Sequence, residues 1–105
     1  MAKYLLLYSG GGMPESEAEQ KAVLKEWEAW YGKIGGAVVD AGNPFTPAAK
    51  SIASDGRVSD DAVGMASGYS ILNAASLEAA VALAKECPIL KGGGRISVFE
   101  TFNMM

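Results

Sequence analysis

The chain has 105 residues, of which half are hydrophobic and a fifth are charged, and its net charge is −3. This length suits one domain with its own apolar core, so we expect residues 1–105 to form a single domain. The acidic balance and the scattered basic residues argue against nucleic-acid binding, which needs clustered lysine and arginine. The one cysteine, Cys87, has no partner for an internal disulfide, so a reducing cytoplasm is the expected compartment.

Residues 3–8 form a short, nearly continuous apolar run with two tyrosines, which predicts a central strand. The run is too short for a secretory signal, and nothing in the chain approaches the roughly 18 apolar residues of a membrane span. We therefore expect no membrane association. The glycines at 10–12 favour a flexible loop over a phosphate-binding loop, because neither nucleotide-binding glycine motif is present.

Residues 16–34 predict a long amphipathic helix. Its apolar stripe consists of Val23, Leu24, Trp27, Trp30, Tyr31 and Ile34, which recur at helical spacing. Ser16 followed by Glu19 is a capping-box start, and the glycines at 35 and 36 supply a stop. We expect the stripe to cover a sheet, with most of the tryptophan surface in the core.

The rest of the chain alternates between strand and helix signals. In order, we predict a strand at 37–41, a turn at 43–47, a small hairpin around Asp55-Gly56, a loop at 60–64, a strand at 68–72, a helix at 76–86 with Leu77, Ala80, Val81 and Ala84 facing inward, and a strand at 95–102. Ser76 is the expected cap of the second helix, and Pro88 its expected end. The hairpin is small and polar, so we expect it at an edge of the fold.

With the hairpin set aside, the element order is βαββαβ. This order predicts an α+β fold of the ferredoxin-like type, in which two helices cover one face of an antiparallel sheet. The expected strands carry apolar residues on both faces of the sheet, whereas the two helices can cover only one of these faces. A homodimer that packs sheet against sheet is therefore the expected assembly.

Several short motifs agree with a known family. They are residues 3–8 (KYLLLY), 40–44 (DAGNP), 68–71 (GYSI), 76–80 (SLEAA) and 87–88 (CP). On these motifs the chain resembles the YCII-related family, and within it the branch called DGPF-domain proteins. The resemblance implies ferredoxin-like subunits that pair into a dimeric α/β barrel, with a pocket at or near the interface.

The chain departs from this family at the proposed acid–base pair. Better-studied members carry a histidine on the first helix and an aspartate before the proline that follows the second helix. This chain has no histidine; Lys25 lies near the first position and Cys87 occupies the second. Asp61 matches the aspartate of the DGPF motif, but residues 62–64 are Ala-Val-Gly. We expect the fold to carry over and the catalytic pair not to.

Three residues are weak catalytic candidates: Asp61, Glu100 and Lys25. Asp60-Asp61 is a paired carboxylate suited to metal binding or general-base work, although such a pair in a loop is more often a solvated turn or a cap. Glu100 follows Ile96 and Val98 on one strand face, so burial would raise its pKa and make it a base. No spacing of metal ligands is present, and we expect neither a metal nor a cofactor.

Candidate ligand-binding residues are Tyr8, Tyr31, Asn43, Phe45, Asp61 and Tyr69, which combine aromatic surface with polar groups. The leading hypothesis is a homodimeric α/β-barrel protein that binds a small apolar or aromatic metabolite without acid–base turnover. The alternative is a lyase, isomerase or dehalogenase acting on ring-derived acids, with Asp61 or Glu100 as base. A third reading, a module that regulates a protein partner, has no support in the residues.

Overall fold

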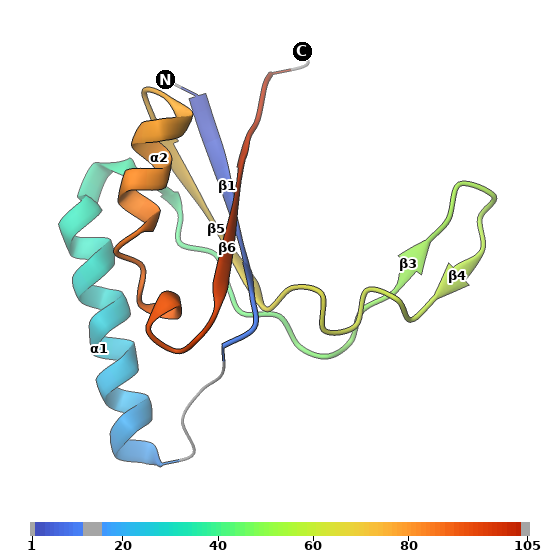
Figure 1. The fold of residues 1–105 in the computed structure, drawn as a ribbon, viewed down its shortest axis with the longest axis horizontal. Helices are drawn as coiled ribbons and strands as arrows, with labels where there is room; N and C mark the ends of the chain where they lie inside the picture. Colours follow the sequence, from blue (N-terminus) through green and yellow to red (C-terminus); the bar gives the residue numbers. More distant parts are fainter. Residues whose placement is uncertain (1, 12–15, 104–105) are drawn as a thin grey trace.

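The computed structural model describes residues 2–11 and 16–103. These residues form two α-helices, an antiparallel sheet of four strands and a small sheet of two strands (Figure 1). In order, the elements are β1 Ala2–Ser9, α1 Glu17–Ile34, the 3₁₀ turn η1 Gly35–Ala37, β2 Val38–Asp40, β3 Ser51–Ile52, β4 Val58–Ser59, β5 Gly68–Ala74, α2 Leu77–Ala84, the 3₁₀ turn η2 Pro88–Leu90 and β6 Arg95–Glu100. The predicted α+β class and antiparallel sheet are confirmed. Of the predicted glycine loop at 10–12, Gly10 and Gly11 are described, and residue 12 lies outside the described residues.

The main sheet has the strand order β2-β5-β1-β6, and every neighbouring pair is antiparallel. Leu6 of β1 lies opposite Ser70 of β5 on one side and Val98 of β6 on the other. The first strand is therefore central, as the apolar run predicted. This order, with the helices of the βαβ units crossing over one sheet face, is compatible with the ferredoxin-like arrangement.

Alternate residues of β1 and β5 form the core beneath the two helices. The buried positions on the central strands are Tyr4, Leu6, Tyr8, Gly68, Ser70, Leu72 and Ala74. Trp30 and Ala84 cover this face from α1 and α2. The intervening residues Leu5, Leu7 and Ile71 face the other way and are only partly covered. One face of the sheet is thus closed by helices, while the chain itself supplies little cover for the opposite face.

Both helices begin where their capping signals predicted. The Ser16 hydroxyl oxygen accepts a hydrogen bond from the Glu19 backbone N–H at 3.1 Å, and the Ser76 hydroxyl oxygen accepts one from Ala79 at the same distance. Each bond satisfies a backbone donor that the first helical turn leaves without a partner. At the other end of α1, Gly35 adopts φ +51° and its N–H donates to the Tyr31 carbonyl.

Two details of the helices differ from prediction. α2 ends at Ala84 rather than near residue 86, and Pro88 begins the turn η2 instead of terminating the helix. Leu77 and Leu24, both expected to face the core, are 41% and 52% exposed. The buried residues of α2 are Ala80 and Ala84, so α2 packs on the sheet through small side chains. Leu24 lies over a cavity, described below, that separates it from the strands.

β2 and β6 are shorter than predicted, whereas β1 and β5 are longer. β2 begins at Val38, because the preceding glycines form the turn η1, and β6 ends at Glu100 rather than at residue 102. The predicted hairpin is confirmed: β3 and β4 pair, and the Asp55 carboxylate accepts a hydrogen bond from the Arg57 N–H at 2.8 Å. In Figure 1 this hairpin extends away from the main sheet. We call residues 45–66 the arm; it leaves and rejoins the body at the rim of the cavity.

Candidate functional site

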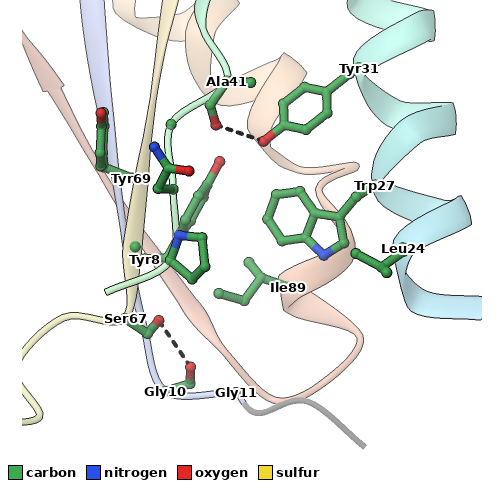
Figure 2. A pocket seen from close by; sticks show the side chains of 14 residues that line it. Tyr8, Gly10, Gly11, Leu24, Trp27, Tyr31, Ala41, Ser67, Tyr69 and Ile89 are labelled. Atoms are coloured by element: carbon green, nitrogen blue, oxygen red, sulfur yellow. Dashed lines mark hydrogen bonds between the residues drawn. The ribbon is translucent and has the colours of Figure 1, made fainter. Parts of the chain in front are cut away.

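A cavity of about 340 Å³ lies between α1 and one end of the main sheet (Figure 2). Its lining comes from α1 (Leu24, Trp27, Tyr31), the end of β1 (Tyr8, Gly10, Gly11), the loop after β2 (Ala41, Gly42, Asn43, Pro44), the start of β5 (Ser67, Gly68, Tyr69) and η2 (Ile89). Segments far apart in the sequence therefore meet there. The volume falls at the lower end of the range typical of small-molecule pockets, about 300–1,000 Å³.

Aromatic rings form one wall of the cavity. The half-buried Trp27 ring meets Tyr8 edge-on at 5.5 Å between centroids, and Trp30 and Tyr31 at 5.9 Å each. Edge-on and tilted contacts are favourable arrangements of aromatic pairs. The Trp30 indole N–H donates to the Leu83 carbonyl at 3.0 Å, whereas that of Trp27 has no hydrogen-bond partner among the described residues. Trp27 thus offers the cavity a ring and an N–H donor.

Three hydroxyl groups and one carbonyl form a closed hydrogen-bond network behind this wall. The Tyr8 hydroxyl donates to the Ser70 oxygen at 2.8 Å, and the Ser70 hydroxyl donates to the Ala41 carbonyl at 2.8 Å. The Tyr31 hydroxyl donates to the same carbonyl at 2.9 Å and lies 3.2 Å from the Ser70 oxygen. Ser70 is fully buried, so the network satisfies a polar group that would otherwise be costly to bury.

The two tyrosines of this network are held in their neutral form. Burial raises the pKa of Tyr8 well above its usual value of 10, and it raises the pKa of Tyr31 in the same direction; the bond to Ser70 opposes both shifts more weakly. A neutral phenol that keeps its proton and donates it in a hydrogen bond within the protein is a poor base. These hydroxyls therefore hold the rings in position and do not supply a proton acceptor.

The loop after β2 approaches β5 so closely that it requires glycine. Gly42 has φ +75°, and a Cβ atom there would lie 1.7 Å from the Tyr69 carbonyl oxygen. The Gly42 N–H donates to one oxygen of the Asp40 carboxylate at 2.8 Å, and the Tyr69 hydroxyl donates to the other at 3.3 Å. Asp40 thus ties the loop to β5, and this contact defines one rim of the cavity.

Four of the six candidate ligand-binding residues line the cavity: Tyr8, Tyr31, Asn43 and Tyr69. Phe45 does not; it stacks on Tyr69 at 5.9 Å and lines a separate depression at the base of the arm. Asp61 lies in an exposed turn of the arm and is not part of the lining either. Whether the four lining residues bind a ligand stays a prediction.

The weak catalytic candidates do not meet in space. Glu100 is exposed on β6 and accepts a hydrogen bond from the Tyr4 hydroxyl at 3.0 Å, so the burial that would make it a base is absent. Lys25 and Asp61 are exposed on α1 and on the arm. Cys87 is 2% exposed, and burial raises the pKa of its thiol, as fits a small core residue. None of these four side chains lines the cavity.

Sequence reasoning missed several residues of the site. The helical spacing places Trp27 and Leu24 in the core stripe with Trp30, and it assigns no role to Gly42 or Ser70. Ser70 carried a usable signal: it occupies a helix-facing position two residues before Leu72, where an apolar residue is the norm. A polar residue at such a position indicates a buried hydrogen-bond network.

Comparisons with known proteins add no family or relative. The chain matches no family model and no curated protein. The resemblance to the YCII-related family therefore stays a prediction.

Within residues 2–11 and 16–103, neither helix combines the length and the apolarity needed to cross a bilayer. In the same part of the chain, no three histidine, cysteine, aspartate or glutamate residues are grouped so as to hold a metal ion.

Proposed function

We propose that this protein is a homodimer of the YCII-related, dimeric α/β-barrel type that binds a small apolar or aromatic metabolite in the cavity between α1 and the sheet. The observation that carries the proposal is the cavity itself. Its size suits a small molecule, rigid aromatic rings form one wall, and the hydroxyls behind that wall are bonded to one another. A site of this kind binds ring systems through apolar contact.

Binding without acid–base turnover fits the residues around the cavity. A general base must come within hydrogen-bond reach of the proton that it abstracts. Among the described lining residues the ionisable side chains are tyrosines, and the pKa of both Tyr8 and Tyr31 is raised. Histidine, the side chain best suited to proton transfer near neutral pH, does not occur in the chain. Asp61 and Glu100, the bases of the enzymatic alternative, do not line the cavity of a single chain.

The assembly is argued from the uncovered sheet face. Leu5, Leu7 and Ile71 of the two central strands point away from the helices, and on the same face of β6 Phe99 is 50% exposed. A contiguous apolar face of this kind marks an interface in a globular protein. A second copy of the chain presents the same face, and pairing the two about a twofold axis covers both.

Ligand binding is tested with a panel of one-ring and two-ring aromatic compounds by isothermal titration calorimetry. We expect a member of the panel to bind the wild type, and Trp27→Ala to weaken that binding by about tenfold or more, because a ring that contacts the ligand is removed. Glu28→Ala changes the next, exposed residue of α1 and should leave the affinity unaltered. Undiminished binding by Trp27→Ala, or no binding by any compound, would overturn the proposal.

The absence of turnover is tested on the same protein. We expect no conversion of lactone or chlorinated ring-cleavage compounds from about pH 5 to about pH 9, the range in which a histidine base would operate. Conversion that disappears in Asp61→Asn or Glu100→Gln would establish the enzymatic alternative.

Light scattering tests the homodimer. The expected mass is twice the chain mass of 10.9 kDa. Ile71→Lys places a charge on the uncovered face and should shift the protein towards the monomer, because burying an unpaired ammonium group is strongly unfavourable. Ile52→Lys, at a 73% exposed position of the arm, is the matched control and should leave the mass unchanged. A monomeric wild type contradicts the proposal.

A further inference from the structure

The lining of the cavity also bears on the charge of its ligand. We propose, on the basis of the function proposed above, that the cavity selects electrically neutral ring compounds carrying a hydrogen-bond acceptor and rejects the corresponding carboxylates. The inference rests on three features of the described residues: the lack of charge in the lining, the pairing of the nearest charges, and the position of the free polar groups.

None of the described residues that line the cavity is an aspartate, glutamate, lysine or arginine. The carboxylate nearest in sequence to the lining belongs to Asp40, whose two oxygens accept hydrogen bonds from the Gly42 N–H and the Tyr69 hydroxyl, both groups of lining residues. A negative charge is thus fixed directly behind one rim. An anionic ligand would meet this charge without any opposing lysine or arginine in the lining.

Two lysines on the α1 and η2 side of the cavity are engaged in ion pairs. On the α1 and η2 side, Lys91 pairs with Glu26 at 3.7 Å, and Lys33 pairs with Glu86 at 2.7 Å. Each pair is solvent-exposed and nearly neutral as a unit, so its field inside the cavity is weak. A carboxylate that entered would exchange water for an apolar wall without gaining a counter-ion, which is unfavourable.

Among the described residues of the rim, the backbone at Gly10 and Gly11 is the feature that suggests an anion site. Both residues have φ +68°, and turn conformations of this kind can orient successive backbone N–H groups towards an anion. However, the Gly10 carbonyl accepts a hydrogen bond from the Ser67 hydroxyl at 3.2 Å. This hydroxyl is therefore already engaged and does not donate to an anion at this rim. Carbonyl oxygens next to the site repel an anion, and no cation among the described lining residues offsets them.

The free polar groups instead fit a neutral ligand. Among the described residues, neither the Trp27 indole N–H nor the Asn43 side-chain amide has a hydrogen-bond partner, and both residues line the cavity. An indole N–H donates only, whereas an amide both donates and accepts. An apolar cavity of about 150 Å³ holds benzene, so the volume of about 340 Å³ leaves room for two fused rings and one amide or hydroxyl group.

The test compares naphthalene-2-carboxamide with naphthalene-2-carboxylate, which share ring and shape and differ in charge. Binding is followed at about pH 7 through the two indole N–H signals in ¹H–¹⁵N NMR spectra. The amide should shift the Trp27 signal and leave the Trp30 signal in place, because the Trp30 N–H is bonded to Leu83 inside the protein. We expect the carboxylate to bind at least about tenfold more weakly than the amide.

A pair of variants separates charge from shape. Leu24 lines the cavity and is 52% exposed, so a longer polar side chain fits there without burial. Leu24→Lys should abolish or reverse the preference for the amide. Leu24→Gln, which is polar but uncharged, should weaken both ligands alike and preserve their ratio.

The outcomes distinguish this inference from the proposed function. Equal or tighter binding of the carboxylate to the wild type would overturn the charge selection and leave the proposed binding function standing. A response of the Gly10 and Gly11 amide signals to inorganic phosphate would also overturn it, by revealing an anion site. If neither naphthalene compound nor any smaller aromatic compound moved the Trp27 signal, the binding function itself would fail, and the inference with it.

Discussion

The layer between the helices and the sheet contains two regions that differ in packing. Around Leu6 and Leu72 the layer is closed, and both side chains are completely buried. Towards Tyr8, two residues further along β1 on the same sheet face, it opens into the cavity. The difference follows from the helices: α2 packs through Ala80 and Ala84, which allow close approach, whereas α1 presents Trp27, a large ring that rests on other rings.

This comparison shows how a small domain keeps a cavity without collapsing. Aromatic side chains have few rotatable bonds, and the hydroxyls of Tyr8 and Tyr31 are fixed by Ser70 and the Ala41 carbonyl. A flexible aliphatic wall would move inward to fill a void, because each lost contact weakens the packing. Here the rings and their hydrogen bonds hold the walls apart.

The largest expected effect distinguishes the two tryptophans. Trp30 is 4% exposed and belongs to the closed region, so Trp30→Ala should lower the free energy of unfolding by about 3–5 kcal/mol, the range for truncating a buried aromatic. Trp27 is half-buried, and Trp27→Ala should cost only about 1–2 kcal/mol while it weakens ligand binding by about tenfold or more. Urea denaturation measures both. Equal losses would mean that the cavity wall is part of the core.

Gly42→Ala is expected to cost about 3 kcal/mol or more, because the new Cβ would clash with the Tyr69 carbonyl and the backbone would also be strained at positive φ. Gly93→Ala is the control: its φ is +84°, but a Cβ there meets nothing within 4 Å. The control should lose about 1 kcal/mol from strain alone. Similar losses in the two variants would show that the loop moves aside freely.

The smallest expected effect concerns the hydroxyl network and alkaline pH. Because the pKa of Tyr8 and of Tyr31 is raised in the folded protein, the folded state holds these protons more tightly than the unfolded chain. Stability should therefore be constant up to about pH 9 and fall above about pH 10, where unfolded tyrosines ionise. Tyr8→Phe should cost about 1 kcal/mol at neutral pH and make that fall shallower. An equally steep fall in the variant would contradict this account.

Local sequence patterns were sufficient for most of the secondary structure. Ser16, Ser76 and Asp55-Gly56 mark helix starts and a hairpin, because capping and tight turns depend on residues within a few positions of each other. Alternation along residues 68–72 likewise puts Ile71 and Leu72 on opposite sheet faces, and the structure buries Leu72 on the helix-covered face. The errors fall at element ends: η1 includes the first residue of a predicted strand, and α2 ends two residues before its predicted end.

The candidate site was predictable only in part. Tyr8, Tyr31, Asn43 and Tyr69 were selected by residue type and do line one cavity, but Phe45 and Asp61 were selected in the same way and do not. Residue type alone does not tell which loop turns inward. The arm carries its residues beyond the rim, and no pattern in residues 45–66 indicates that direction.

The sequence by itself determined the element order, the helix caps, the hairpin and the absence of any histidine base, since each depends on neighbouring residues or on composition. Only the tertiary structure decided that Trp30 is core and Trp27 is cavity wall, although the two lie three residues apart on one helix stripe. Helical spacing determines which residues share a face, but not what lies opposite each turn. What lies opposite depends on where β1 ends and how closely α2 packs, and both are non-local.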